Sequence, residues 1–350
     1  MKVETWVAGA VKRAFGEGAV FGELRPMLGQ ASNRKHYRQE LAGPAGTAPT
    51  AVVVELPPDP FVSDEASAEK GVEELPFVNV LRFLEARGVR VPGLLVDGTA
   101  EGFLLLEDLG EETMLNVMER LPESQGLWYR RSIDLLVSFQ GATMPLEQGP
   151  GSGCVAYSRS FTRELLRWEL DHFTEWGLQG RGVALCEADL GALGRHYDEL
   201  VSELLGAPQV VVHRDFQSTN LIPVGDGLGL IDFQDALIGP WPYDLVALLR
   251  DSYVELSPRQ VEEFIEYYWG LTPLAGGCTL ERFRELFYLQ VVQRKLKDAG
   301  RFVFIDRVKG NPRFLKYVEP TLGYVSHALG EVPGLAPLRQ LLGRLVPEIG

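Results

Sequence analysis

Residues 210–235 constrain the fold of this chain more than any other stretch. The stretch begins with three valines, continues with a polar cluster from His213 to Asn220, and ends with two apolar runs around Gly225, Asp226 and Gly227. Glycine permits the positive φ values that tight hairpin turns require. The pattern therefore predicts a buried strand, a polar loop and a β-hairpin in direct succession.

The hairpin predicts where two polar side chains meet. Asn220 and Asp232 are each six residues from Asp226, so a hairpin centred on Asp226 pairs them across the strands, with their side chains on one face. A carboxylate and an amide oxygen that converge in this way suit a hard cation such as Mg²⁺. Asp215 precedes the first hairpin strand and is placed to accept a proton from a substrate hydroxyl beside that metal.

This arrangement resembles the H-R-D-x-x-x-x-N loop and metal aspartate of the protein-kinase-like phosphotransferases. His213, Arg214, Asp215 and Asn220 match the loop at the required spacing, and Asp232 stands where the aspartate of D-F-G stands. Gln in place of that glycine is usual in small-molecule kinases of the aminoglycoside phosphotransferase type. An ordinary hairpin with surface Asp and Asn residues would not need all of these matches at once.

The resemblance implies an α+β, two-lobed protein-kinase-like fold that uses ATP and Mg²⁺. A small, β-rich N-lobe is expected over residues 1–109 and a larger, mainly helical C-lobe over residues 110–350. It also implies catalytic roles for Asp215, His213 and Arg214, and metal ligation by Asn220 and Asp232.

A second segment, residues 29–38, is similar to the G-G-x-S-N-x-x-Y-R loop of the same superfamily. A glycine and small polar residues at a strand turn can bring backbone N–H groups against phosphates, although a surface turn before a basic strand explains the composition equally well. The resemblance implies that the nucleotide is held by Gly29, Ser32, Asn33 and Arg34.

The strand predicted at residues 51–56 lacks the lysine that holds the α- and β-phosphates in kinases. Arg34, Lys35 or Arg38 is the candidate for the missing positive charge. A later strand is predicted over residues 102–106, and Glu107 to Gly110 follow it, where a kinase has its inter-lobe hinge. Glu107 and Leu109 are therefore candidates for binding adenine, although a plain strand terminus would look the same.

Composition limits the class of partner. The chain has 350 residues and a net charge of −14, which disfavours nucleic-acid binding. No apolar run approaches the roughly 20 residues that span a bilayer, and residues 1–18 do not resemble a secretion signal. The three cysteines, at positions 154, 186 and 278, form neither a zinc spacing nor a disulfide framework. These features predict a cytoplasmic protein without a membrane partner, with buried, reduced cysteines.

The basic run from Arg294 to Lys309 stands out in an acidic chain. Helical spacing places Arg294, Lys297 and Arg301 on one face, where they could contact substrate, although a solvated helix surface is the usual fate of such a run. Asp235 could contact substrate or be an ordinary turn residue. An aspartate at position 244 resembles the residue that braces the catalytic loop in this superfamily.

Four stretches, at residues 31–34, 102–110, 213–249 and 289–302, resemble the anomeric kinases of N-acetylmuramate and N-acetylglucosamine from bacterial cell-wall recycling. The resemblance implies transfer of the ATP γ-phosphoryl group to the C1 hydroxyl of an amino sugar. A sugar-1-phosphate nucleotidyltransferase would use the product. The basic helical face would pair with the lactyl carboxylate that only N-acetylmuramate carries.

Two alternatives remain at this stage. A kinase for a cationic substrate such as an aminoglycoside or choline suits the negative net charge, whereas the basic run favours a neutral or anionic sugar. A pseudokinase that only senses nucleotide suits the missing strand lysine, whereas the retained Asp215, Asn220 and Asp232 argue for catalysis.

Overall fold

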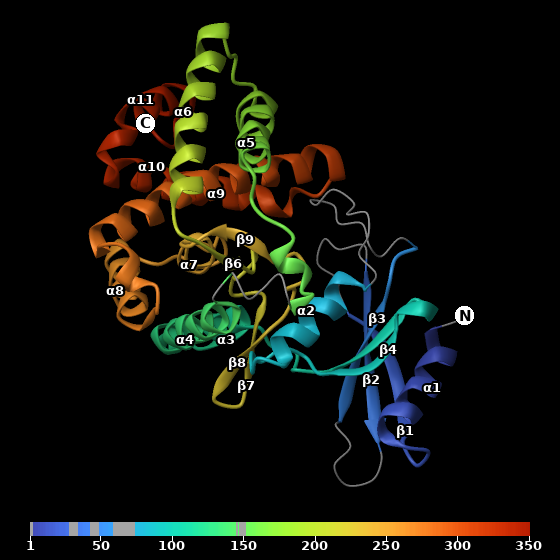
Figure 1. The fold of residues 1–350 in the computed structure, drawn as a ribbon. Helices are drawn as coiled ribbons and strands as arrows, with labels where there is room; N and C mark the ends of the chain where they lie inside the picture. Colours follow the sequence, from blue (N-terminus) through green and yellow to red (C-terminus); the bar gives the residue numbers. More distant parts are fainter. Residues whose placement is uncertain (1–2, 28–33, 43–48, 59–73, 145, 147–151) are drawn as a thin grey trace.

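The N-terminal part of the computed structural model is a five-stranded antiparallel sheet (Figure 1), and the structure describes residues 3–27, 34–42, 49–58, 74–144, 146 and 152–350. The strand order is β1-β2-β3-β5-β4. The strands span Val20–Pro26 (β1), Lys35–Ala42 (β2), Thr50–Glu55 (β3), Leu94–Gly98 (β4) and Phe103–Glu107 (β5).

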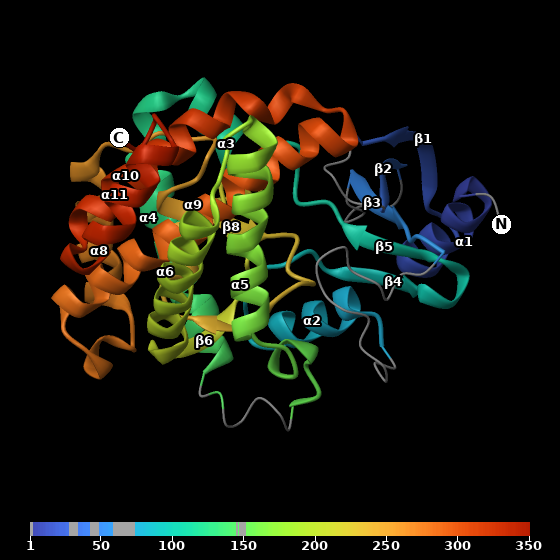
Figure 2. The ribbon, with the colours of Figure 1, turned by 90° about the horizontal axis from the view of Figure 1, so that it is seen from above.

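Two helices cover the two faces of this sheet. Because side chains alternate between the faces of a strand, Val53 packs under helix α1 (Val3–Phe15), while its neighbour Val54 joins the core on the opposite face, together with α2 (Pro76–Glu85). The side chain of Trp6 on α1 stacks on Phe103 of β5 with ring centroids 5.2 Å apart. Figure 2 shows α1 on the outer side of the sheet and α2 on the side that faces the rest of the molecule.

The C-terminal part is mainly helical, with short strands between the helices (Figure 1). The helices are α3 (Met114–Arg120), α4 (Gln125–Thr143), α5 (Arg163–His172), α6 (Glu187–Gly206), α7 (Tyr243–Leu249), α8 (Pro258–Leu271), α9 (Leu280–Lys309), α10 (Val318–Glu331) and α11 (Ala336–Leu345). The strands pair as β6 (Gln209–Val212) with β9 (Leu237–Pro240), and as β7 (Leu221–Val224) with β8 (Gly227–Leu230).

Helix α9 is the central element of this part. It passes beneath α5 and α6 in Figure 1 and is 30 residues long. Its buried side chains include polar ones, with Arg294 and Lys295 each only 2% exposed. A charged residue in such a place requires a partner, and the partners of these two residues form part of the candidate site.

The predicted two-part α+β fold is confirmed. The boundary after residue 109 remains a prediction, because one apolar core continues from the inner face of the sheet into the helical part. None of the helices in the described part of the chain combines the length and apolar composition that crossing a membrane requires.

The expectation of buried cysteines is correct for Cys154 and wrong for Cys186. Cys186 is exposed because it occupies the N-cap of α6, where its thiol donates to the carboxylate of Asp189 at 3.1 Å. Cys278 is half-buried.

Candidate active site

The loop between β6 and β7 carries the predicted catalytic residues and is fixed from below by Asp244 at the start of α7. Its carboxylate accepts the backbone N–H groups of His213 at 2.7 Å and Arg214 at 3.0 Å. Arg214 has φ 78°, an unfavourable backbone conformation for a non-glycine residue that needs such support. Burial raises the pKa of Asp244 to about 6, although His213 and the two N–H groups oppose this rise. The bracing role expected of Asp244 is confirmed.

His213 connects the same loop to the hairpin. Its Nε2 lies 3.0 Å from the carbonyl oxygen of Ile231, and its Nδ1 accepts the backbone N–H of Asp215 at 3.2 Å. One ring nitrogen therefore donates and the other accepts, which defines a neutral imidazole. Burial lowers the pKa of this histidine in agreement with that state. The ring lies inside the protein, so it holds Asp215 in place from behind.

The register predicted for the hairpin is wrong by one residue. Leu221 pairs with Leu230 and Val224 with Gly227, so the turn consists of Gly225 and Asp226 and is not centred on Asp226. Gly225 has φ 56°, the left-handed conformation that glycine adopts readily.

Asn220 consequently lies opposite Ile231, whose N–H donates to the Asn220 carbonyl oxygen at 3.1 Å. Asp232 is the next residue, beyond the ladder, with φ 66°. The positive φ turns the chain at this point, so the position of the Asp232 side chain is set by the backbone turn and not by strand pairing.

Asn220 and Asp232 nevertheless have the properties of metal ligands. The Nδ2 of Asn220 donates to the carbonyl oxygen of Asp215 at 2.9 Å, while its buried Oδ1 has no hydrogen-bond partner among the described residues. Burial, followed by the charge of Asp215, raises the pKa of Asp232 to about 6. A free acceptor oxygen and a carboxylate under like-charge repulsion both gain from a cation, so these residues fit Mg²⁺.

Gln234 connects Asp232 with Asp235, a pairing that the sequence did not indicate. Its Nε2 donates to Oδ1 of Asp232 at 2.9 Å and to Oδ2 of Asp235 at 3.1 Å. The glycine that stands at this position in protein kinases could not make these contacts. Asp235 therefore lies beside Asp232 rather than on a remote turn.

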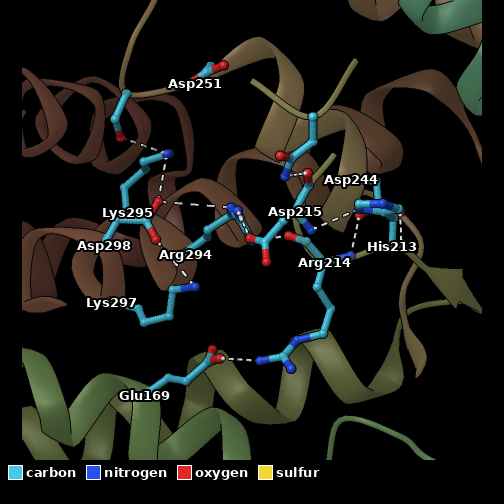
Figure 3. A network of polar contacts seen from close by, with 12 residues as sticks. Glu169, His213, Arg214, Asp215, Asp244, Asp251, Arg294, Lys295, Lys297 and Asp298 are labelled. Atoms are coloured by element: carbon cyan, nitrogen blue, oxygen red, sulfur yellow. Dashed lines mark hydrogen bonds and ion pairs between the residues drawn. The ribbon is translucent and has the colours of Figure 1, made fainter. Parts of the chain in front are cut away.

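Asp215 is partly accessible, with 46% of its side chain exposed, and Arg294 of α9 lies against it (Figure 3). Arg294 donates to the backbone carbonyl of Arg214 at 2.7 Å and lies 3.4 Å from Oδ1 of Asp215. Burial acts to raise the pKa of Asp215, but the charges of Arg294, Lys297 and Arg214 outweigh it and hold the pKa below its usual value. The carboxylate is therefore ionised and oriented.

The first part of the basic run of α9, from Arg294 to Asp298, is not a solvated face, whereas Arg307 and Lys309 at its end are exposed. Asp298 takes up three of its cations: the distances from its carboxylate are 2.8 Å to Lys295, 3.3 Å to Lys297 and 3.9 Å to Arg294. Lys295 also donates to Ser252 at 3.3 Å. The spacing of Asp298, three residues after Lys295 and four after Arg294, is a signal from which this pairing could have been predicted.

Arg214 extends away from Asp215 towards α5, as Figure 3 shows, and its guanidinium lies 3.9 Å from the buried carboxylate of Glu169. Oε2 of Glu169 also accepts from Gln293 at 2.6 Å. Together with Trp168, His172, Lys297 and Arg301, Glu169 lines a pocket between α5 and α9. Lys297 and Arg301 thus lie together, whereas Arg294 is bound to the catalytic loop.

On the N-terminal side, Arg34 is the cation that faces the metal pair. It is largely buried, which lowers its pKa, while the charges of Asp235 and Asp232 raise it. Its guanidinium lies 6.0 Å from the ring of Phe77 on α2. The other predicted phosphate-binding residues, Gly29, Ser32 and Asn33, lie outside the described residues.

The two other candidates for the missing strand lysine are bound elsewhere. Lys35 forms an exposed ion pair with Glu55 at 2.9 Å. Arg38 pairs with Asp108 at 2.5 Å and with Glu111 at 2.6 Å, which ties β2 to the segment after β5. Of the three cations proposed from the sequence, only Arg34 has Asp232 and Asp235 as its electrostatic neighbours.

The segment predicted as a hinge is linked to the catalytic hairpin through Arg90. The guanidinium of Arg90 donates to both carboxylate oxygens of Glu107, at 2.7 and 2.5 Å, and its backbone carbonyl accepts the N–H of Leu230 at 2.8 Å. Leu109 packs against β8 so closely that a Cβ at Gly229 would lie 2.6 Å from its Cδ1. The side chain of Glu107 is thus occupied, and its backbone N–H donates to the carbonyl oxygen of Gly93 at 2.8 Å.

Comparison with known proteins assigns the chain to a family. The Phosphotransferase enzyme family matches residues 23–276. An N-acetylmuramate/N-acetylglucosamine kinase of Pseudomonas aeruginosa is 33% identical over 327 residues, which are 92% of this chain and 88% of that protein. A protein of the same name from Neisseria meningitidis serogroup B is 33% identical over 279 residues, covering 78% of this chain and 80% of that protein.

Solved structures agree on the fold. A choline/ethanolamine kinase family protein from Mesorhizobium loti superposes with a TM-score of 0.58 at 14% identity over the whole of both chains. A choline kinase from Streptococcus pneumoniae gives 0.57 at 15% identity, over 94% of this chain and 98% of that one. With most of its length matched by the family and by curated relatives, the chain belongs to the phosphotransferase enzyme family.

Proposed function

We propose that the protein is an ATP-dependent kinase that phosphorylates the anomeric hydroxyl of N-acetylmuramate and N-acetylglucosamine. The observation that carries this proposal is the one-third identity, over 92% and 78% of this chain, to two kinases named for these two sugars. The ionised, partly exposed carboxylate of Asp215 supports it, because a sugar hydroxyl must be oriented and deprotonated during transfer.

In the proposed reaction Asp215 accepts the proton of the C1 hydroxyl. Arg294 keeps the Asp215 carboxylate ionised and oriented. His213 fixes the loop beneath Asp215 through the contacts of its two ring nitrogens. We assign positioning roles to His213 and Arg214, because the first is buried behind the loop and the second points to Glu169. Correct placement of the nucleophile is a large part of catalysis in phosphoryl transfer.

Asn220 and Asp232 would hold Mg²⁺, which when bound supplies positive charge that neutralises the phosphate oxygens. Arg34, with Gly29, Ser32 and Asn33 of the adjoining segment, would contact the same phosphates from the N-terminal side. In the described residues no set of three or more His, Cys, Asp or Glu side chains forms a metal cage.

The backbone of Glu107 and Leu109 would bind the adenine edge, and Asp235, beside the metal pair, would contact the sugar. The product, a sugar 1-phosphate, would be used by a nucleotidyltransferase that forms a UDP-sugar. The proposed setting is recycling of cell-wall sugars in the cytoplasm, where ATP is available.

A kinase for choline or an aminoglycoside is the second candidate, favoured by the solved structures that share the fold. Against it, Arg294 lies 3.4 Å from Asp215, and the charge of Lys297 also acts on that carboxylate. A cationic acceptor would be repelled there, whereas a neutral or anionic sugar would not. A nucleotide-sensing pseudokinase has no use for the oriented base.

Phosphate transfer to a panel of N-acetylmuramate, N-acetylglucosamine, kanamycin and choline, followed by phosphorus and proton NMR of the products, tests the proposal. The expected product carries phosphate on C1 of the amino sugar. Phosphate on kanamycin or choline alone would replace the proposed function with the second candidate. ATP binding without any transfer would favour the sensor.

A further inference from the structure

The side chain of His36 on β2 lies on the inner face of the N-terminal sheet. Tyr37 and its strand partner Val53 both pack in the outer cluster under α1. Because side chains alternate along a strand, the neighbouring His36 faces the other side, where its own partner Val54 joins the core shared with α2. The imidazole therefore lies on the side of the sheet that faces the helical part of the molecule (Figure 2).

The residues two positions before and after His36 belong to opposite ends of the proposed nucleotide site. Arg34 has Asp232 among its electrostatic neighbours, at the end proposed for the phosphates. Arg38 forms an ion pair with Asp108 at 2.5 Å, in the segment proposed for adenine. Residues two apart on a strand are separated by about 7 Å, so His36 lies over the middle of the site. In a nucleotide that spans these ends, the middle is where the first phosphate follows the ribose.

His36 also stands opposite the strand from which kinases hold the α- and β-phosphates. That strand, β3, has no lysine here, and its inward side chains are Val52 and Val54. Their partners across the ladder are Arg38 and His36, and paired residues have Cβ atoms about 4.5–5.5 Å apart. Arg38 is already bound to Asp108. Of the two partners, His36 is therefore the one left for a ligand.

The imidazole of His36 is suited to donate a hydrogen bond. It is half-buried, and it makes no hydrogen bond within the part of the chain that the structure describes. Burial, followed by the positive charge of Arg34, lowers its pKa, so the ring is neutral at pH 7 and carries one N–H donor. A donor of this kind gains from an acceptor, and a charged phosphate oxygen is a strong one.

We infer that His36 donates a hydrogen bond to the phosphate nearest the ribose of the bound nucleotide and so takes over part of the role of the absent lysine. This assignment rests on the proposed function for the identity of the nucleotide as ATP. Arg34 serves the outer phosphates beside Asp232, whereas His36 serves the inner one. The contact distinguishes a nucleotide from a nucleoside and is independent of the acceptor sugar.

The test compares ADP with adenosine, which lacks the phosphates. Competition against a fluorescent ATP analogue, whose own affinity is measured for each protein, gives the affinity of both ligands. His36→Phe keeps a ring and removes the donor, so it should reduce the preference for ADP about tenfold, as the loss of one charged hydrogen bond does, and leave the affinity for adenosine unchanged. His36→Gln can still donate and should retain most of the preference.

Tyr37→Phe is the matched control. Tyr37 is the next residue on the same strand, faces the outer side of the sheet, and loses one hydrogen bond, to Glu55 at 2.8 Å. This variant should keep the wild-type preference for ADP. His36→Leu, which is also unable to donate, gives the same comparison if phenylalanine does not fit at position 36.

The outcomes separate this contact from the proposed function. An unchanged preference for ADP in His36→Phe, or an equal reduction in Tyr37→Phe, overturns the assignment even if sugars are phosphorylated. Parallel losses of ADP and adenosine affinity would show a packing role and also overturn it. A preference reduced in His36→Phe alone supports the contact even if no sugar is phosphorylated, and in that case the proposed function alone is lost. A wild-type protein that binds neither ligand would remove both.

Discussion

Asp232→Asn should make the free protein more stable at neutral pH while removing its metal-dependent nucleotide binding. Asp232 has a pKa of about 6 in the folded protein, against an ordinary 3.8, because burial and the charge of Asp215 oppose its ionisation. At about 1.36 kcal/mol for each unit of pKa, this difference is worth up to about 3 kcal/mol. Loss of the contact with Gln234 would reduce the gain, so about 1–3 kcal/mol is expected.

The sign follows from proton binding. Between pH 3.8 and 6 the unfolded chain has released the Asp232 proton while the folded protein keeps it. The stability contributed by this group therefore falls as pH rises through that window, and the full penalty applies above pH 6. Asparagine does not ionise, so the advantage of the variant should be large at pH 7.5 and small at pH 4.5.

Thermal unfolding of both proteins at the two pH values, with and without Mg·ATP, measures these effects. Wild type should gain stability from Mg·ATP and the variant should not. Asparagine also tolerates positive φ better than most residues, but that benefit does not depend on pH. Asp226→Asn, in the fully exposed turn, is the control and should behave as wild type. Equal stabilities at pH 7.5, or an unchanged response to Mg·ATP, would refute the electrostatic argument.

Three further variants test the remaining parts of the site. Asp215→Asn should keep ATP affinity and lose on the order of 10²–10⁴ in kcat, and rapid-quench assays showing normal transfer would remove its role as base. Arg34→Gln should weaken ATP binding at least severalfold while Lys35→Gln, a neighbouring exposed cation, should not; equal affinities by titration would leave the missing lysine unreplaced. Arg294→Gln should raise the pKa of Asp215 and move the acidic limb of the pH–rate profile upward with both sugars, and an unshifted profile would mean that Arg294 only holds the backbone.

Local patterns predicted the catalytic segment well because each element is set by residues close in sequence. The strand, loop and hairpin of residues 209–230 follow from apolar runs and glycines. The predicted register was wrong because a glycine–aspartate–glycine sequence can form a hairpin turn of two residues or of three. Only the structure distinguishes these two turns. The bracing role of the aspartate at position 244 could be predicted only from the resemblance to the kinase superfamily.

Contacts across long sequence separations were not predictable. Arg38 and Asp108 are 70 residues apart, and the pairing of Arg214 with Glu169 joins the catalytic loop to a different helix. The basic run of α9 had the composition of a solvent-facing surface. Its burial depends on Asp298 and on packing against α5 and the catalytic loop, which are arranged only in the folded protein.

The Arg90 link has a consequence for the dimensions of the ligand. The segment after β5 and the hairpin that carries Asn220 and Asp232 are joined by a backbone hydrogen bond, an ion pair and the close contact of Leu109 with Gly229. The two ends of the proposed nucleotide site, the segment after β5 for adenine and the hairpin for the phosphates, are therefore held at a fixed separation. If the proposed site is correct, a nucleoside without its phosphates would engage only one end, and we expect it to bind more weakly than ATP.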